Sequence, residues 1–261
     1  MSQLVPPAVD GWDSALAAAP RPAVARAAAR TTDPPALLGA LFPTASAASL
    51  RTMGDAATVV RYTQGARLWD EGERPASFLV LTRGFVRVSR VHASGNEHTL
   101  GVFGPRECIG LIAFADDRPY PGAAFAMSDD VTLIAVPGRV ARAVMDADAG
   151  LCRALLGRMA GNARQLMAKI SLVSQGAAAE RVAALLLHMA DRFGDETGEG
   201  TLWIPVRLTR RTVGELVDAR VETVIRLMSQ WQRDGWIHAS TDGIEIIDVA
   251  RLRQLAEGGG G

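Results

Sequence analysis

The sequence contains few cysteines, few aromatic residues and no excess of charge of either sign. Its two cysteines, Cys108 and Cys152, exclude a disulfide scaffold and a four-cysteine iron–sulfur site, and they lack the spacing of a zinc site. Lys+Arg 28 balances Asp+Glu 28, which weakens any case for nonspecific nucleic-acid binding. No apolar run approaches the length of a membrane span, and no charged-then-apolar leader opens the chain. We therefore expect a cytoplasmic protein without a membrane partner.

Sequence motifs of the common enzyme classes are also missing. The chain shows no Ser/His/Asp, paired-carboxylate, HExxH or phosphate-loop pattern, so we do not expect an enzyme. Its 261 residues, of which 48% are hydrophobic, are enough for two modest domains that each have a core.

Two short amphipathic segments are present within residues 207–238. Thr209 is suited to cap the first segment, and Asp218 is suited to the tight corner between the two. The second segment carries an apolar stripe and, on its opposite side, a stripe that includes Glu222 and Arg226 at helical spacing. This pattern predicts a helix-turn-helix.

Glu222 and Arg226 lie one turn apart near the start of the second predicted helix, where side chains of a recognition helix reach base edges. Arg can donate two hydrogen bonds to guanine, and Glu can accept one from cytosine. The alternative is an intrahelical ion pair that contributes only about 0.2–0.5 kcal/mol. The corner and the surrounding arginines favour DNA. The residues predicted to contact bases are Glu222, Arg226, Val221 and Ile225, and those predicted to contact phosphates are Thr209, Arg210, Arg211, Arg220, Thr223 and Arg233.

A β-hairpin with its turn at 241–243 is predicted directly after this unit, in the position of a wing. Residues 180–250 resemble the C-terminal domain of the CRP/FNR transcription regulators, and the segment VETVIR at 221–226 looks most like the FNR and FixK branch. The resemblance implies that Glu222 and Arg226 read a TGA core in a palindrome. Ile225 stands where that branch usually has Ser, so the preference at the outer base stays open.

Short β-patterned runs separated by glycine turns follow one another through residues 35–146, a pattern typical of a sandwich or roll. The layout resembles the β-roll of cyclic-nucleotide-binding domains. The expected strands are 58–62, 67–70, 77–81, 85–90, 98–103 and 131–136. Residues 1–34 are rich in Ala and Pro, which predicts a disordered extension, with a transit peptide as the alternative. Prolines there, including Pro34 and Pro35, are expected to interrupt any helix.

A long helix is expected over about 147–175, with a hinge at Gln175-Gly176. Apolar residues recur in it every seven positions in two series, which predicts a coiled-coil seam, although the same seam could pack on its own roll. The seam residues are Cys152, Leu156, Met159, Ala163, Leu166, Ile170 and Val173. The expected α+β fold therefore comprises a β-roll at 35–146, a dimerisation helix and hinge at 147–176, and a winged helix-turn-helix at 177–257.

The family resemblance also identifies where cyclic AMP would be held. At the positions of its usual polar contacts this chain has Leu111, Pro121, Gly122, Leu166 and Met167. A cyclic phosphate buried there would lack a cationic partner, so we expect cyclic AMP not to be the ligand. The predicted effector pocket consists of Gly110, Leu111, Tyr120, Pro121, Gly122, Leu166 and Met167.

Residues 117–122 look similar to nitric-oxide-responsive regulators of the same superfamily, some of which are linked to haem. Haem is therefore an alternative ligand, with His98 or His188 as its axial residue, while His92 and His238 fit surface or turn positions. The expected partners are double-stranded DNA, a second copy of the chain and RNA polymerase. A different class remains open, namely a ligand-binding regulatory subunit whose winged helix contacts protein.

Overall fold

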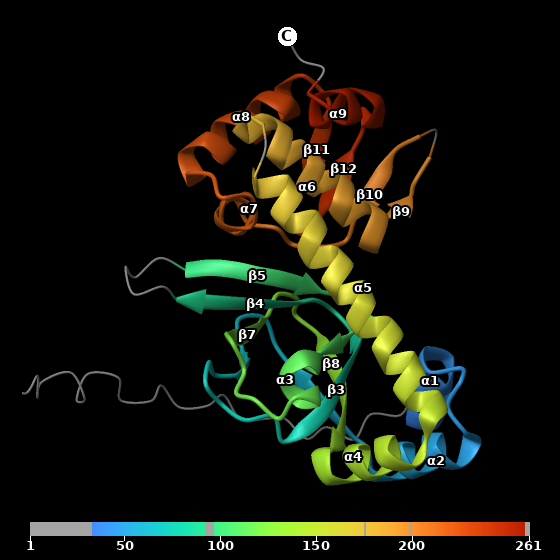
Figure 1. Ribbon diagram of the computed structural model, residues 1–261. Helices are drawn as coiled ribbons and strands as arrows, with labels where there is room; N and C mark the ends of the chain where they lie inside the picture. Colours follow the sequence, from blue (N-terminus) through green and yellow to red (C-terminus); the bar gives the residue numbers. More distant parts are fainter. Residues whose placement is uncertain (1–32, 92–96, 175, 199, 259–261) are drawn as a thin grey trace, which may run out of the picture.

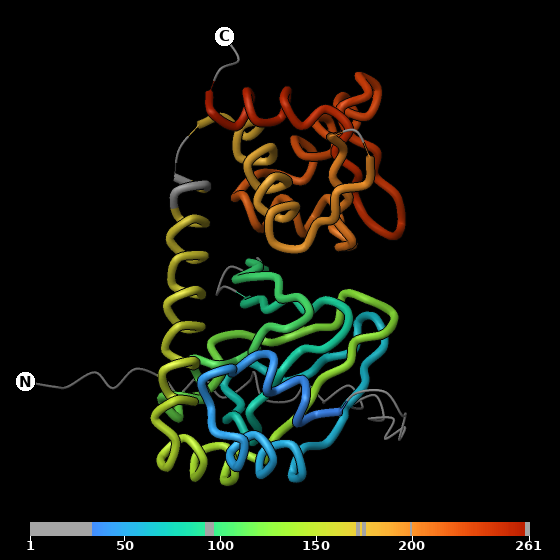
Figure 2. The backbone as a smooth tube through the Cα atoms, turned by 90° about the vertical axis from the view of Figure 1, so that its right-hand side faces the viewer, coloured from blue at the N-terminus to red at the C-terminus, as the bar shows by residue number. Residues whose placement is uncertain are grey.

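The computed structural model describes residues 33–91, 97–174, 176–198 and 200–258. The extension predicted for 1–34 lies outside these residues, apart from its last two. A β-roll and a helix-turn-helix domain lie one above the other, and one long helix runs beside both of them (Figures 1 and 2). Among the described helices, none combines the length and the apolar character needed to cross a bilayer.

The roll consists of two antiparallel four-stranded sheets with orders β1-β8-β3-β6 and β2-β7-β4-β5. Its strands are β1 Thr58–Tyr62, β2 Arg67–Trp69, β3 Ser77–Arg83, β4 Val86–Val91, β5 Glu97–Phe103, β6 Cys108–Ile109, β7 Ala123–Ala126 and β8 Val131–Pro137. The expected strands are all present. No pattern in the sequence marks β6, which has two residues, or β7, whose sequence AAFA lacks β-branched residues.

Helices cover one side of the roll. They are α1 Pro34–Leu41, α2 Ala47–Ala56 and α4 Gly138–Ala147, while the short α3, Leu111–Ala115, follows β6. The expectation that Pro34 and Pro35 interrupt a helix is wrong, because they occupy the first two positions of α1. A proline is tolerated there, since an amide at the first turn has no partner within the helix.

The long helix α5, Ala149–Ser174, begins two residues after α4 ends. Asp148 separates them, and its carboxylate accepts hydrogen bonds from the amides of Ser46 and Leu151. The Ser49 hydroxyl, followed by these two amides, holds the pKa of Asp148 well below its usual range. One carboxylate thus caps the start of α5 and anchors the start of α2.

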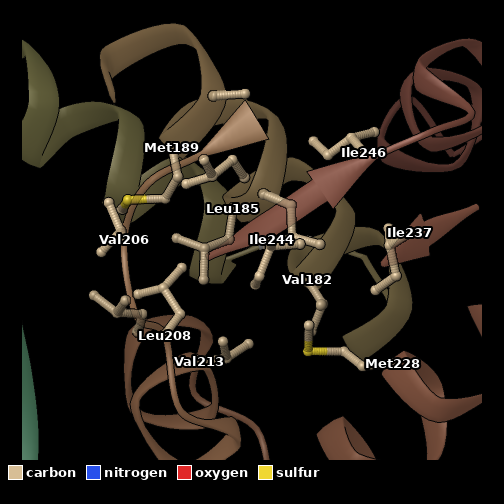
Figure 3. Close-up of a cluster of buried hydrophobic side chains, with 14 of the residues drawn as sticks. Val182, Leu185, Met189, Val206, Leu208, Val213, Met228, Ile237, Ile244 and Ile246 are labelled. Carbon is tan, nitrogen blue, oxygen red and sulfur yellow. The ribbon is translucent and has the colours of Figure 1, made fainter. Parts of the chain in front are cut away.

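The C-terminal domain contains α6 Ala178–Phe193, α7 Arg210–Val217, α8 Val221–Arg233 and α9 Val249–Ala256. Its sheet has the order β11-β12-β10-β9, with β9 Asp195–Glu196, β10 Leu202–Ile204, β11 Ile237–Ala239 and β12 Ile244–Ile246. The predicted hairpin is the pair β11–β12. Figure 3 shows the apolar core on which these elements pack, including Leu185 from α6, Val213 from α7 and Met228 from α8.

This core continues into the roll, because Phe85, Val102 and Met127 of the roll belong to the same buried cluster. The ring of Phe193, at the end of α6, lies edge-on to Phe85 at 5.3 Å between centroids. Gly104 permits this approach, since a Cβ at that position would lie 2.5 Å from the Phe193 ring. The two domains therefore share an apolar contact.

A polar cluster of Arg87, Glu97, Thr99 and Glu215 also joins the two domains, and we call it the interdomain cluster. The Thr99 hydroxyl on β5 donates to the Glu215 carboxylate on α7 at 2.6 Å, and Thr99 is only 1% exposed. Arg87 lies 2.6 Å from Glu97 and 4.0 Å from Glu215. Burial raises the pKa of Glu97, but hydrogen bonds from Ser89 and Arg87 outweigh it and lower that pKa.

We predict that Thr99→Val and Glu215→Gln are energetically coupled. A hydrogen bond to a charged, mostly buried carboxylate should give a coupling of about 1.5 kcal/mol in the free energy of unfolding, measured by urea denaturation of both single variants and the double variant. Thr132→Val, which changes a buried threonine on β8, serves as the matched control, and its effect should add to that of Glu215→Gln. Additive effects of the Thr99 and Glu215 changes would contradict the prediction.

Candidate DNA-binding surface and ligand cavities

The helix α8 presents a polar face to solvent. It buries Val224, Met228 and Trp231, so the opposite side leaves Glu222 and Arg226 exposed, with Ile225 between them 47% exposed. Within the described part of the chain, neither Glu222 nor Arg226 has an ion-pair partner. The intrahelical ion pair considered from the sequence is therefore not formed.

The corner before α8 is fixed from outside the helix-turn-helix. Asp218 adopts a left-handed conformation with φ 51° and ψ 55°, as its sequence position suggested. Arg181 on α6 donates to the carbonyls of Val217 at 2.9 Å and Asp218 at 3.1 Å. The same guanidinium donates to the carbonyl of Gly176 at 2.9 Å, beside the expected hinge. Sequence reasoning missed Arg181, because a charged residue on an amphipathic helix gives no sign of a distant partner.

The residues predicted to contact phosphates lie on and around α7 and α8, but they differ in how exposed their side chains are and in whether those side chains already form hydrogen bonds. Thr209 caps α7 by accepting from the Thr212 amide at 3.0 Å, and Arg220 at the start of α8 is exposed. Arg210 donates to Gln232 at 2.9 Å, and burial lowers its pKa. Arg211 lies 3.2 Å from Glu215 and so contacts the interdomain cluster.

Two further residues of that set lie on α8. Thr223 is half-buried in its first turn, whereas Arg233 is exposed at its end and donates to Gln230 at 2.5 Å. Val221, predicted to contact bases, is half-buried at the first position of the helix.

The seam predicted on α5 has two parts. Leu151 and Leu155 pack into the core on the helix-covered side of the roll, Met159 contacts that core, and Cys152 donates to the Met145 carbonyl at 3.0 Å. Farther along, large apolar side chains face solvent. These are Leu156, 65% exposed, Leu166, 56%, Met167, 69%, and Ile170, 55%. Ala163 is exposed within this row and Val173 is half-buried at its end, so the first turns serve the roll and the later turns carry large, partly exposed apolar side chains.

A cavity of about 420 Å³, which we call the roll cavity, lies between the roll and α5. It includes most of the predicted effector pocket, namely Gly110, Leu111, Tyr120, Pro121 and Leu166. Met167 instead points to solvent, and Gly122 serves the structure by accepting a hydrogen bond from the Trp69 indole at 2.9 Å.

The Tyr120 ring stacks on Trp69 with centroids 4.3 Å apart, and both side chains are buried. Gly110 is needed beneath it, since a Cβ there would lie 2.6 Å from the ring. Burial raises the pKa of Tyr120 to about 12, so its hydroxyl stays neutral. Sequence reasoning missed Trp69 as a wall residue, because it lies far from Tyr120 in the chain.

A second, larger cavity of about 770 Å³ lies between the two domains, and we call it the interdomain cavity. Its walls come from β5, α3, α5, α6 and α7. His188 is on its wall, and burial, followed by the charge of Arg192, lowers the pKa of this histidine. His98 and His238 are exposed on strands, and His92 lies outside the described residues.

Comparison with known families matches both domains in order. Residues 59–148 match the cyclic nucleotide-binding domain family, and residues 180–255 match the Crp-like helix-turn-helix domain family. The chain belongs to the CRP/FNR superfamily. It is a transcription regulator with a cyclic-nucleotide-binding-type roll and a helix-turn-helix, as the sequence resemblance predicted.

Relatives in the CRP/FNR superfamily align over most of the chain. The CRP-like cAMP-activated global transcriptional regulator of Mycobacterium tuberculosis is 26% identical over 197 residues, covering 76% of this chain and 87% of the relative. The transcriptional activator protein anr of Pseudomonas aeruginosa is 26% identical over 195 residues, covering 75% and 79%.

Solved structures of CRP/FNR proteins share the fold. FixK2 from Bradyrhizobium japonicum superposes with a TM-score of 0.67 at 24% identity, covering 76% of this chain and 96% of FixK2. A CRP-family transcriptional regulator from Thermus thermophilus gives a TM-score of 0.63 at 21% identity, with coverage of 76% and 96%.

Proposed function

We propose that this CRP/FNR regulator acts as a homodimer, reads a TGA-containing palindrome through α8, and responds to a signal other than cyclic AMP. The observation that carries the proposal is the exposed pair Glu222 and Arg226, neither of which has an ion-pair partner within the described chain. A protein-contacting wing would not require an acid and a base one turn apart at the start of this helix.

The geometry of α8 supports base reading. Its N-terminal turns carry the pair, which is where a recognition helix enters the major groove. Arg226 can bond guanine O6 and N7, and Glu222 can accept from cytosine N4. Ile225, exposed between them, offers only an apolar contact, which fits a thymine methyl. It cannot form the hydrogen bond that the serine usual at this position in the FNR and FixK branch would form.

The exposed apolar row on α5 supports the homodimer. Burying a large aliphatic side chain contributes about 1.5–3 kcal/mol, so four such residues exposed on one helix favour a partner surface of the same kind. Two copies paired along α5 would place two recognition helices on the half-sites of a palindrome.

The roll cavity supports a ligand other than cyclic AMP. The Trp69–Tyr120 stack occupies space within the roll, and Leu111, Pro121 and Leu166 are apolar where a nucleotide would need polar contacts; Asn162 is the uncharged amide on the described wall. Lys169 is the cationic residue on the described wall, but its ammonium group donates to the carbonyls of Thr99 and Leu100. A cyclic phosphate would therefore be poorly compensated.

Arg226→Ala should weaken binding to a TGA-containing palindrome by about 1–3 kcal/mol, because the bidentate contact with guanine is lost. Fluorescence anisotropy with a labelled duplex, at one fixed salt concentration, measures this. Arg253→Ala removes an arginine from α9 and is the control, with little loss expected. Equal affinities of wild type and Arg226→Ala would remove the base-reading role.

Ile170→Glu should convert the protein to monomers, because it places a charge within the apolar row that we propose to be buried between two copies. Sedimentation velocity measures the oligomeric state. Arg164→Glu, also on an exposed position of α5, should leave the dimer intact. A dimer that survives Ile170→Glu would refute the α5 interface.

Cyclic AMP at millimolar concentration should not raise the melting temperature, because we propose that it does not bind; a ligand that binds only the folded state stabilises it increasingly as its concentration exceeds Kd. Differential scanning fluorimetry checks this, with 5′-AMP as the matched nucleotide. A rise seen with cyclic AMP but not with 5′-AMP would show that the roll cavity accepts the cyclic phosphate.

A further inference from the structure

The interdomain cavity has the size and the walls of a small-molecule site. Its volume of about 770 Å³ falls within the usual range of about 300–1,000 Å³ for ligand pockets. Both domains contribute apolar wall residues, including Val102 and Phe103 from β5, Leu185 and Met189 from α6, and Leu216 from α7. Leu185 and Met189 extend from the core drawn in Figure 3, so this wall is firmly held.

The charged groups of the cavity all have one sign. Among the described residues that line it, the ionisable ones are Lys169, His188 and Arg192, and none is acidic. Arg192 donates through Nη2 to Glu107 at 2.7 Å, but its Nε is buried and has no hydrogen-bond partner within the described chain. A buried donor without an acceptor is costly, so a rotation of the Arg192 side chain that brought this N–H to an anionic or acceptor group in the cavity would be favourable.

We propose that the interdomain cavity binds a small amphipathic carboxylate, whose apolar body lies against Leu185, Met189 and Leu216 and whose acidic group faces Arg192. This inference rests on the proposed function in one respect: it takes the ligand to be the signal that controls DNA binding. The walls are mainly apolar, and beside Asn162 and Gln165 they offer the base and ribose of a nucleotide few hydrogen-bond partners.

The ligand would contact both sides of the interdomain cluster. Leu100 lines the cavity and follows Thr99, while Leu216 lines it and follows Glu215. Occupancy therefore acts on the strand and the helix that the Thr99–Glu215 hydrogen bond joins. A ligand that contacts both domains has a different affinity for their docked and separated arrangements, which is the requirement for allosteric control.

Isothermal titration calorimetry with the saturated acids from octanoate to hexadecanoate tests the site. Each added methylene should tighten binding about fourfold, until the cavity is filled and the gain stops. The primary alcohol of the same length should bind at least about tenfold more weakly, since a charge-assisted hydrogen bond is lost. Arg192→Met should reduce this acid-to-alcohol ratio. Failure of all these acids to bind, or equal affinity of acid and alcohol, would overturn the proposal.

Ala184→Trp places a large ring inside the cavity and should weaken the binding of dodecanoate at least about tenfold. Ala115→Trp, on the exposed end of α3, is the matched control and should leave this binding unchanged. Ala168→Trp, from the opposite wall, replaces Ala184→Trp if that variant fails to show a cooperative thermal transition. Unchanged binding by a folded cavity variant would place the ligand elsewhere and refute the site.

Reciprocal linkage separates the ligand site from the DNA function. Dodecanoate should change the operator affinity by the same factor by which operator DNA changes the affinity for dodecanoate. Unchanged operator affinity at saturating dodecanoate would refute the signal role, whereas loss of operator binding in every condition would refute the proposed function instead. A haem absorption band in the purified protein that His188→Ala removes would assign the cavity to haem and overturn the proposal.

Discussion

The hydrogen bond from Thr99 on β5 to Glu215 on α7 is the buried polar contact around which the two domains are packed. It is buried, so separating the domains leaves a hydroxyl and a carboxylate to be resolvated while apolar surface around Phe193 is exposed. The strand that carries Thr99 also forms part of the walls of both cavities. An occupant of either cavity would therefore contact the strand that is hydrogen-bonded to α7, and α7 packs against α8, the helix that we propose to read DNA.

The helix α5 serves two different surfaces along its length. Its first turns are committed to the roll through Leu151 and Leu155, while its later turns expose Leu166 and Ile170. Leu166 is at once part of the exposed row and part of both cavity walls. A partner helix on the row and a ligand in a cavity would thus meet at the same residue, which gives dimerisation and ligand binding a shared structural basis.

Local patterns in the sequence predicted the elements but not the contacts between them. Helical spacing and the Thr209 cap were enough to place Glu222 and Arg226 on the solvent face of α8, because both signals act within a few residues. The short strand β7 and the helix starting at Pro34 were not predicted, since tertiary packing rather than propensity fixes them. The stack of Trp69 on Tyr120, like the interdomain cavity, arises only when distant segments meet.

Arg181 joins the segment beside the proposed hinge to the corner that precedes α8. Its guanidinium holds the carbonyl of Gly176 at one end and those of Val217 and Asp218 at the other. Gly176 has a φ of 78°, in the left-handed region that favours glycine, so any other residue would strain the backbone at this position. Because a planar guanidinium fixes all three carbonyls relative to one another, a rotation at Gly176 must either break charge-assisted hydrogen bonds or turn the corner that precedes α8. The corner that precedes α8 is therefore tied to Gly176, beside the proposed hinge, through one side chain, independently of the contact between β5 and α7.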